Sequence, residues 1–218
     1  MNKVELVAMT KPMIEGIDTA EQFIAYCARV SNPTNQLNNE TAEKLLPYCV
    51  KNKHWSIFET VNIVMSIETT RDIGRQILRH RSFSFQEYSQ RYAAVAEMSE
   101  PRETRLQDQK NRQNSIETDN VALEESWDWR QEKLKALANE YYQWAIDNGV
   151  AKEQARVVLP EGLTMSRMYM SGSLRSWIHY CELRMGNGTQ KEHREIATQC
   201  WNIIIEQFPS LKNVLNNE

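Results

Sequence analysis

The sequence predicts an α+β fold, with a mostly antiparallel sheet packed with several long helices in a single domain over residues 1–218. Apolar residues at every second position in 61–68 are typical of a strand. Apolar residues at helical spacing in 124–147 indicate a long helix. The predicted helices and strands follow one another without regular alternation, which favours an antiparallel sheet over a parallel α/β fold.

The chain is expected to begin with a strand and a helix. Weak alternation over 3–10 predicts a short strand. Asp18 or Thr19 can cap a helix with one apolar face, which continues to about Val30. This helix is expected to stop there, because Pro33 disfavours helical geometry at the residue before it.

Four more elements and a loop lead to the middle of the chain. In order, the elements are a helix, a strand, a helix and a strand, over about 39–51, 61–68, 71–79 and 85–92. Thr69 or Thr70 can cap the second of these helices. The segment 101–120 is polar and nearly without large apolar groups, so it cannot bury enough surface to fold alone. We expect a mobile surface loop there.

The C-terminal half is predicted to be mainly helical. The helix over 124–147 ends at Asn148-Gly149 and offers large apolar residues to a core: Trp127, Leu134, Leu137, Tyr141 and Trp144. Three of the tryptophans are interpreted as core residues and not as a stacking platform for nucleic acid: Trp127, Trp129 and Trp144. A short helix leads to 155–160, a strand covers 163–171, and helices cover 173–184 and 190–207. His193 is interpreted as a surface residue of the last helix.

Composition and charge limit the possible functions. An apolar content of 41% with 25% charged residues is ordinary for a soluble globular protein, and the net charge of -3 gives no reason to expect general binding to nucleic acid or membrane surfaces. The start of the chain lacks a signal-peptide pattern, and no apolar run approaches the roughly 20 residues of a membrane span, so we expect a cytoplasmic protein. The cysteines lack metal-ligand spacing and are interpreted as reduced core thiols: Cys27, Cys49, Cys181 and Cys200.

A row of arginines marks the predicted helix over 71–79. Arg71, Arg75 and Arg79 share one face, whereas the buried stripe is formed by Ile73 and Ile77. Like charges at this spacing cost roughly a few tenths of a kcal/mol per pair, so a bound anion or acidic side chains are expected to neutralise them. The alternative is a basic face that is simply solvated.

The predicted strand over 85–92 places Glu87, Ser89 and Arg91 on one face. The other face receives Gln86, Tyr88, Gln90 and Tyr92. A carboxylate, a hydroxyl and a guanidinium can together bind a pyrimidine nucleotide, with the arginine on the phosphate. The alternative is a solvent-facing polar strand with an ion pair. Because the local sequence lacks G-x-S-x-G, Ser89 is interpreted as an orienting hydroxyl in preference to a covalent nucleophile.

The stretch RHRSFSFQEYSQRY, from Arg79 to Tyr92, resembles the RHR-x7-S signature of the flavin-dependent thymidylate synthases. Further segments resemble other blocks of that family: ARVS at 28–31, HWSIFE at 54–59, RQ at 75–76, ARVVLP at 155–160, and the R-x8-R helix of Arg175 and Arg184. The resemblance covers most of the chain except 101–120. No GxGxxG or P-loop motif occurs, so arginine, histidine, serine and backbone groups are expected to hold the flavin.

The resemblance implies a set of site residues. Those implied to contact the flavin are Ser31, His54, Ser56, Glu59, Arg79, His80, Arg81, Ser84, Arg175 and His179. Those implied to contact dUMP are Gln76, Glu87, Ser89, Gln90, Arg91, Arg156 and Arg184, with catalytic roles for Ser89 and Arg184. The chain departs from the family pattern at Gln86 and His179, where asparagine is familiar, and at Gly188, where a histidine is sometimes found.

The resemblance also implies an activity and an assembly. The activity is reductive methylation of dUMP to dTMP, with 5,10-methylenetetrahydrofolate and NADPH as co-substrates and FAD as cofactor, in a homotetramer with shared active sites. Two alternatives stay open: a non-enzymatic nucleotide- or RNA-binding protein, and a related one-carbon transferase for another pyrimidine nucleotide. Arg175 and Arg184 are nine positions apart, which places them on opposite sides of a straight helix, so we expect this helix to serve two sites.

Overall fold

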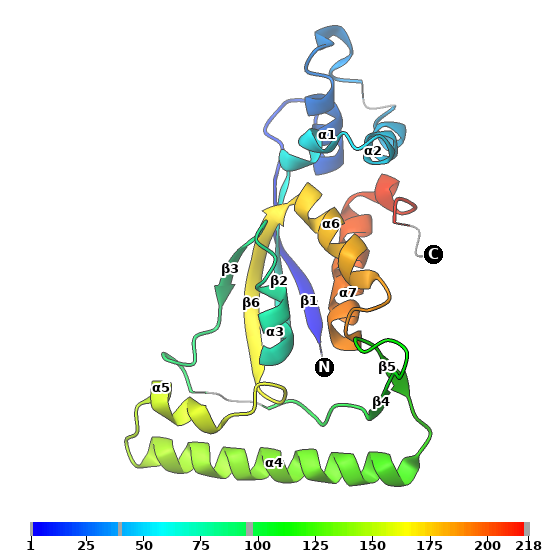
Figure 1. Ribbon diagram of the computed structural model, residues 1–218. Helices are drawn as coiled ribbons and strands as arrows, with labels where there is room; N and C mark the ends of the chain where they lie inside the picture. The colour runs from blue at the N-terminus through cyan, green and yellow to red at the C-terminus, as the bar shows by residue number, and fades with distance from the viewer. Residues whose placement is uncertain (1, 39–40, 95–97, 216–218) are drawn as a thin grey trace.

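A four-stranded antiparallel sheet forms the centre of the molecule (Figure 1). The computed structural model describes residues 2–38, 41–94 and 98–215. The strands lie in the order β1-β2-β6-β3, with the bounds Lys3–Met9, Asn62–Thr70, Met165–Ser173 and Ser84–Glu87. Every neighbouring pair is antiparallel, so the predicted α+β class is confirmed.

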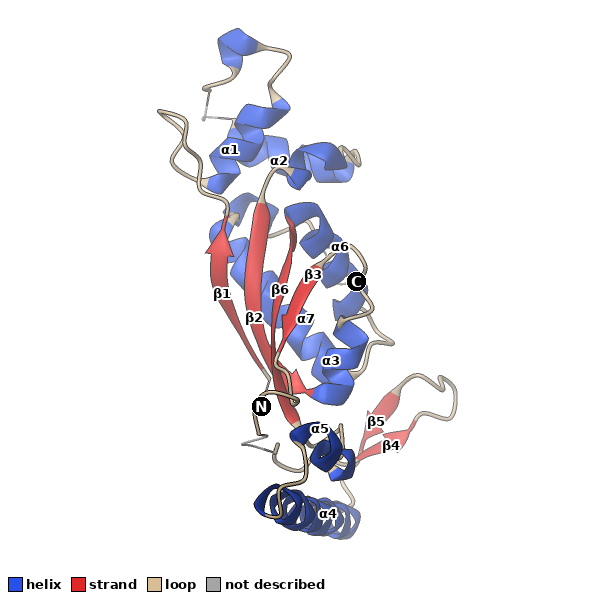
Figure 2. Ribbon diagram, turned by 90° about the vertical axis from the view of Figure 1, so that its left-hand side faces the viewer, coloured by secondary structure: helices blue, strands red, loops and turns tan. Residues whose placement is uncertain are grey.

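Helices cover one face and both ends of this sheet (Figures 1 and 2). The helices on the face are α3, α6 and α7, over Arg71–Ile77, Leu174–Met185 and Lys191–Gln207. At the end where β1 stops lie α1, α2 and the 3-10 helix η2, over Ala20–Ala28, Ala42–Lys51 and Trp55–Glu59. At the opposite end lie α4, α5 and the 3-10 helix η3, over Val121–Asp147, Lys152–Ala155 and Arg156–Val158.

Three small elements complete the fold. A hairpin beside the start of α7 is formed by β4 and β5, over Arg105–Gln107 and Ser115–Glu117. Two single-turn 3-10 helices, η1 and η4, cover Pro33–Asn35 and Pro209–Leu211. No helix in the described part of the chain is long and apolar enough to cross a membrane.

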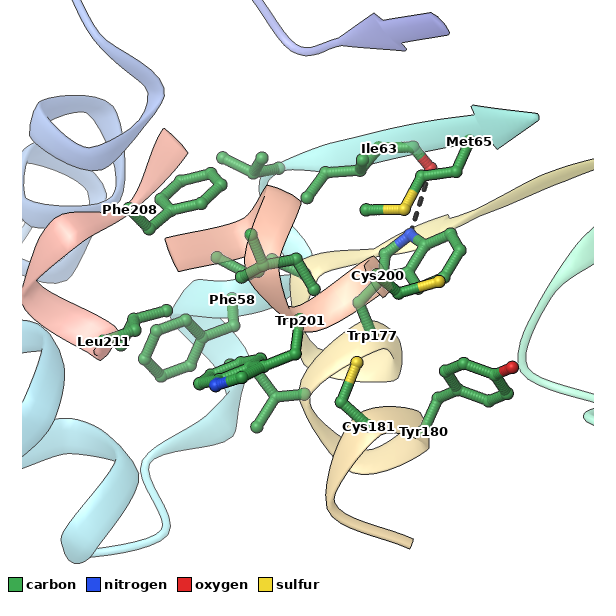
Figure 3. Packing of buried hydrophobic residues seen from close by; sticks show 14 of the residues in the cluster. Phe58, Ile63, Met65, Trp177, Tyr180, Cys181, Cys200, Trp201, Phe208 and Leu211 are labelled. Atoms are coloured by element: carbon green, nitrogen blue, oxygen red, sulfur yellow. Dashed lines mark hydrogen bonds between the residues drawn. The ribbon is translucent and has the colours of Figure 1, made fainter. Parts of the chain in front are cut away.

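The main core lies between the sheet and the helices on its face (Figure 3). The alternation in β2 buries Ile63, Met65 and Ile67, as predicted. Trp177 of α6 packs beside them, and its Nε1 donates a hydrogen bond to the Ile63 carbonyl over 3.1 Å. Burying each such side chain contributes roughly 1.5–3 kcal/mol, so this layer holds α6 firmly against the sheet.

The predicted start of the first helix is confirmed, and its end lies about two residues earlier than predicted. Thr19 and Gln22 form a reciprocal capping box, in which the Thr19 hydroxyl accepts from the Gln22 amide over 3.1 Å. The helix stops at Ala28 and not near Val30. The predicted start of the second helix at Asn39 lies outside the described residues, and α2 begins at Ala42.

The strand predicted over 85–92 is wrong beyond Glu87. Pairing with β6 ends there, although the Tyr88 amide still donates to the Arg167 carbonyl. The chain then turns, because the Ser89 carbonyl accepts from the amides of Tyr92 and Ala93. The Ser89 hydroxyl also accepts from the Arg91 amide over 3.4 Å, which is typical of a serine turn. Alternation therefore does not place these side chains on two faces.

The interpretation of the α4 tryptophans and leucines as core residues is wrong. Trp127 and Trp144 are 46% and 64% exposed, and three more apolar side chains on the same helix are exposed too: Leu134, Leu137 and Tyr141. The helix lies across one end of the sheet and turns its other side inward (Figure 1). The buried residues of that side are Gln131, Ala138, Tyr142 and Ala145.

The prediction of an unpacked loop over 101–120 is wrong at its base. Arg102 binds Asp72 at the start of α3 over 2.8 Å, and Arg105 pairs with Glu192 at the start of α7. The hairpin then extends outward from these ion pairs. Ion pairs therefore hold in place a segment that has too few apolar groups to form a core.

The expectation of reduced core thiols is confirmed for Cys49, Cys181 and Cys200, which are buried and free of disulfides. Cys27 is also free of disulfides but is only half-buried.

Candidate active site

The residues of the Arg79–Tyr92 stretch follow the free edge of the sheet. Arg79 and Arg81 lie on the connection between α3 and β3, and both are exposed. Neither makes an ion pair with a described residue. Ser84 begins β3 opposite Ser171 and is also exposed. Exposed guanidinium groups without carboxylate partners are well suited to a phosphate or another anion.

His80 is the half-buried member of the RHR triplet. Arg184 donates from Nε to His80 Nε2 over 2.9 Å, so the lone pair of that nitrogen faces the guanidinium. Burial, and secondly the charge of Arg184, lower the pKa of His80 to about 4. At neutral pH the ring is therefore uncharged and carries its hydrogen on Nδ1. The positive charge of the triplet comes from its two arginines, and His80 contributes a directional hydrogen bond.

A second group of predicted residues meets where η2 packs against the start of α6. Arg175 donates from Nη1 to Glu59 Oε1 over 3.0 Å. The His179 ring lies against Trp55, with a distance of 4.4 Å between ring centroids. Two further predicted residues on and beside η2 are exposed: His54 and Ser56.

These groups are compatible with a bound flavin. The RHR segment and α6 are joined by the Ser176 hydroxyl, which donates to the Ser82 carbonyl over 3.3 Å, and by the Arg184–His80 pair. The free cations of Arg79 and Arg81 can hold phosphate groups, and the exposed hydrogen-bonding groups beside Trp55 can meet a ring system. Ser31 is exposed on the turn after α1, and no hydrogen bond or ion pair connects its side chain to these residues.

A cavity of about 350 Å³ lies at the other end of the stretch, between α3 and the α5–η3 segment. Three arginines line it: Arg71, Arg75 and Arg156. Gln90 also lines it and is 4% exposed, and its Nε2 has no hydrogen-bond partner among the described residues. An unsatisfied buried amide costs roughly 1–3 kcal/mol, so a ligand with an acceptor atom would relieve that cost.

Carboxylates neutralise two of the three arginines that share one face of the predicted helix over 71–79. This agrees with the hypothesis that acidic side chains or an anion neutralise this face, and not with a face that is simply solvated. Arg71 pairs with Glu87 over 3.5 Å, and Arg75 pairs with Glu161 over 2.8 Å. Arg79 lies beyond the end of α3 at Ile77 and leaves the row.

The turn after β3 brings two more predicted residues towards α5. Arg91 Nε lies 3.3 Å from Glu153 Oε2. Ser89 is exposed, and no described histidine hydrogen-bonds to it. His80, the nearest histidine in sequence, already pairs with Arg184. This arrangement lacks the adjacent base that a nucleophilic serine needs, and it favours the orienting role.

The interpretation of His193 as a surface residue is wrong, because its ring is completely buried. Its Nδ1 lies 3.3 Å from Gln76 Oε1, and its Nε2 lies 3.1 Å from the Tyr180 hydroxyl. The charged neighbours Lys191 and Glu192 suggested a surface position. The helical spacing gave the opposite signal, since the residues 3, 4 and 7 positions after His193 are the buried Ile196, Ala197 and Cys200.

Comparisons with known proteins show the family to which the chain belongs. A family model described as thymidylate synthase complementing protein matches residues 12–210. A probable flavin-dependent thymidylate synthase of Paramecium bursaria Chlorella virus 1 is 52% identical over 212 residues, which is 97% of this chain and 98% of that protein. The chain belongs to the flavin-dependent thymidylate synthase family. Within this family, an enzyme of Synechocystis is 46% identical over 215 residues, covering 97% of this chain and 98% of its own length.

The fold is also found in a solved structure. A UMP/dUMP methylase from Streptomyces cacaoi, bound with 5-Br dUMP, superimposes with a TM-score of 0.81. It is 23% identical in sequence, and the match covers 98% of this chain and 94% of that chain. Because the identity is below 25%, this likeness is evidence for the fold and not for the activity or the substrate.

Proposed function

We propose that this protein is a flavin-dependent thymidylate synthase that converts dUMP to dTMP. The observation that carries the proposal is the arginine-lined cavity beside the signature turn, with the unpaired Gln90 amide in its wall. Arg71 and Arg75 already pair with carboxylates, whereas Arg156 has no ion-pair partner among the described residues. A nucleotide phosphate would meet the charge of Arg156 and supply the missing acceptor of the amide. Family membership over nearly the whole chain supports the same conclusion.

The nucleotide is held mainly by the second half of the signature. Arg91 and Arg156 bind the phosphate, and Ser89 orients the nucleotide. Gln76 and Arg184 approach from the helix-covered side and meet the pyrimidine ring. A guanidinium beside the ring stabilises negative charge that develops there, which makes C5 of uracil more nucleophilic.

The flavin is held by the first half of the signature and by the η2–α6 contact. Arg79 and Arg81 would hold its phosphates, and the exposed groups of His54 and Ser56 beside Trp55 would contact its ring. The Arg184–His80 pair connects α6 to the RHR segment. When bound, FAD supplies the hydride chemistry of the reduction. We propose 5,10-methylenetetrahydrofolate as the carbon donor and NADPH as the reductant.

The proposed assembly is a homotetramer with shared sites, located in the cytoplasm. The exposed apolar face of α4 supports this assembly, because burying Trp127, Leu134 and Trp144 against a second copy would stabilise the contact between subunits. The placement of Arg175 and Arg184 on α6 supports it as well. Each has a partner within its own chain, Glu59 and His80, but the two arginines lie about half a turn apart around the helix.

Spectra and product analysis test the proposal. The purified protein should carry the absorbance bands of bound flavin, and it should convert dUMP, but not dCMP, in the presence of the folate and NADPH. A colourless protein that binds RNA would support the non-enzymatic alternative. A flavoprotein that alkylates dCMP or another pyrimidine nucleotide in preference to dUMP would support the related transferase.

A further inference from the structure

Buried and partly buried hydrogen bonds connect α3, α6 and the start of α7 behind the proposed nucleotide site. The Tyr180 hydroxyl lies 3.1 Å from His193 Nε2, and His193 Nδ1 lies 3.3 Å from Gln76 Oε1. Gln76 then donates from Nε2 to Gln190 Oε1 over 2.7 Å. The Tyr180 hydroxyl points away from the apolar cluster in Figure 3, which leaves it free to join this polar chain.

A carboxylate at the far end gives the chain its direction. Gln190 donates from Nε2 to Glu192 Oε2 over 2.9 Å. Burial is the largest single influence on Glu192 and opposes its ionisation. The hydrogen bonds from Arg105 and from the backbone, together with the charges of Arg105 and Arg102, outweigh it, and the net result is a lowered pKa. An ionised carboxylate can only accept hydrogen bonds, so the amide nitrogen of Gln190 must face it.

Each later bond follows from the first. With its nitrogen on Glu192, Gln190 offers only its oxygen to Gln76, so Gln76 must turn its nitrogen to Gln190 and its oxygen to His193. His193 must then carry its hydrogen on Nδ1, and the Tyr180 hydroxyl must donate to Nε2. In this series of hydrogen bonds, each group therefore donates to the next one, from Tyr180 through His193, Gln76 and Gln190 to Glu192.

We propose that Glu192 sets the orientation of the Gln76 side-chain amide, and that His193 and Gln190 are positioning residues for nucleotide binding. This inference rests on the proposed function, in which Gln76 contacts dUMP. One hydrogen on Gln76 Nε2 and one lone pair on Oε1 remain for the ligand, in a fixed order. Turning the amide over would break the bonds to both His193 and Gln190.

Burial of the histidine supports this arrangement. Burial, followed by the charges of Arg184 and His80, lowers the pKa of His193 to about 3. The ring stays neutral throughout the physiological range, so it keeps one donor and one acceptor. A protonated ring would offer two donors, and Tyr180 could no longer donate to it.

The direction of the chain can be measured without any nucleotide. Solid-state ¹⁵N NMR of protein labelled at its 4 histidines distinguishes a nitrogen that carries hydrogen from one that does not. The signal lost in His193→Asn identifies His193. We expect hydrogen on Nδ1 and a bare Nε2. A hydrogen on Nε2 would overturn the inference, whatever the protein binds.

The positioning role is measured as affinity for dUMP by calorimetry. His193→Leu should bind dUMP roughly tenfold more weakly, because an unfixed Gln76 amide loses hydrogen-bond energy on binding. His193→Asn places an amide donor near the former Nδ1 and should stay within about threefold of the wild type. In turnover, His193→Leu should raise KM more than it lowers kcat.

Two further variants complete the experiment. Ile196→Ala removes a buried side chain of the same helix that has no polar group, so it should lower the melting temperature and leave the affinity for dUMP unchanged. Gln190→Met is the second test if His193→Leu does not fold, and it should show the same loss of affinity. Wild-type affinity in a folded His193→Leu or Gln190→Met protein, or an equal loss in Ile196→Ala, would overturn the positioning role. If the wild type itself binds no dUMP, the proposed function fails, and the NMR result still decides the direction of the chain.

Discussion

His80 and His193 are both neutral near pH 7, and the cause lies in their surroundings. Burial is the main reason that the pKa falls to about 4 for His80 and to about 3 for His193. The charge of Arg184 acts on both rings in the same direction. Each ring therefore offers one donor and one acceptor in a defined place. At the scale of the residue, the histidines of this site provide hydrogen-bond direction, and the arginines provide charge.

The buried histidine should make the protein sensitive to acid. The unfolded chain takes up a proton at His193 near its ordinary pKa of about 6.5, whereas the folded protein does so only near 3. The stabilising contribution is thus complete above about pH 6.5 and is lost as the pH falls towards 3, with a total on the order of a few kcal/mol. Urea unfolding at neutral pH and near pH 5 should show a smaller loss for His193→Asn than for the wild type. Equal losses would contradict the buried neutral state.

Flavin retention should depend on the RHR segment. The double variant His80→Ala plus Arg81→Ala should lose bound FAD and keep its far-UV circular dichroism, because Arg81 is exposed and His80 is half-buried. A matched control removes two basic groups from the hairpin connection, Lys110→Ala plus Arg112→Ala, and should keep the flavin. Full flavin occupancy in the first variant would remove this segment from the flavin site.

At the scale of the element, periodicity and capping predicted the features that depend on local sequence, and they failed for the features that depend on neighbouring elements. The alternation of β2 and the capping of α1 are local signals, and both are confirmed. The end of β3 depends on how far β6 pairs with it, which the alternation of residues 85–92 does not reveal. The exposed face of α4 has the same spacing as a core face, since only the arrangement of the elements decides what lies against it.

The candidate site was predictable to a similar extent. The resemblance to the family implied residues that the fold brings together in pairs, such as Glu59 with Arg175 and His80 with Arg184. It could not predict His193 and Gln190, which act through Gln76 from a helix more than 100 residues away in sequence. Contacts between such distant segments depend on tertiary packing, which periodicity does not encode.

The ion pairs at the base of the hairpin should determine where proteases cut. Arg102 and Arg105 are tied to α3 and α7, whereas Lys110 and Arg112 lie in the exposed connection between β4 and β5. Limited digestion with trypsin should therefore cleave first after Lys110 or Arg112, because cleavage needs a locally unfolded backbone. First cleavage after Arg102 or Arg105, read by mass spectrometry, would show that the ion pairs do not order the base.

At the scale of the whole molecule, a single chain leaves the apolar face of α4 exposed. It also places its two groups of predicted site residues at opposite ends of the sheet, one group around η2 and the other around the cavity beside η3. Association of identical chains would cover α4 and bring different ends together. On α6, Arg175 faces η2 and Arg184 faces His80, so one helix can connect two sites in an assembly.

Mixing of inactive variants tests this sharing. Arg175→Ala and Arg184→Ala should each be inactive alone. When subunits are allowed to exchange, some mixed oligomers should contain an intact site, and activity should return. If native mass spectrometry shows exchange and no mixing ratio restores activity, both arginines serve the same site.

The most direct test of the central claim follows the transferred carbon. The purified protein is incubated with FAD, dUMP, NADPH and methylenetetrahydrofolate labelled with ¹³C in its methylene group, and the nucleotides are analysed by mass spectrometry. We expect dTMP that carries the label, only when the reductant is present, and almost none with Arg156→Ala at the same nucleotide concentration. Bound flavin without labelled dTMP under these conditions would contradict the assignment as a thymidylate synthase.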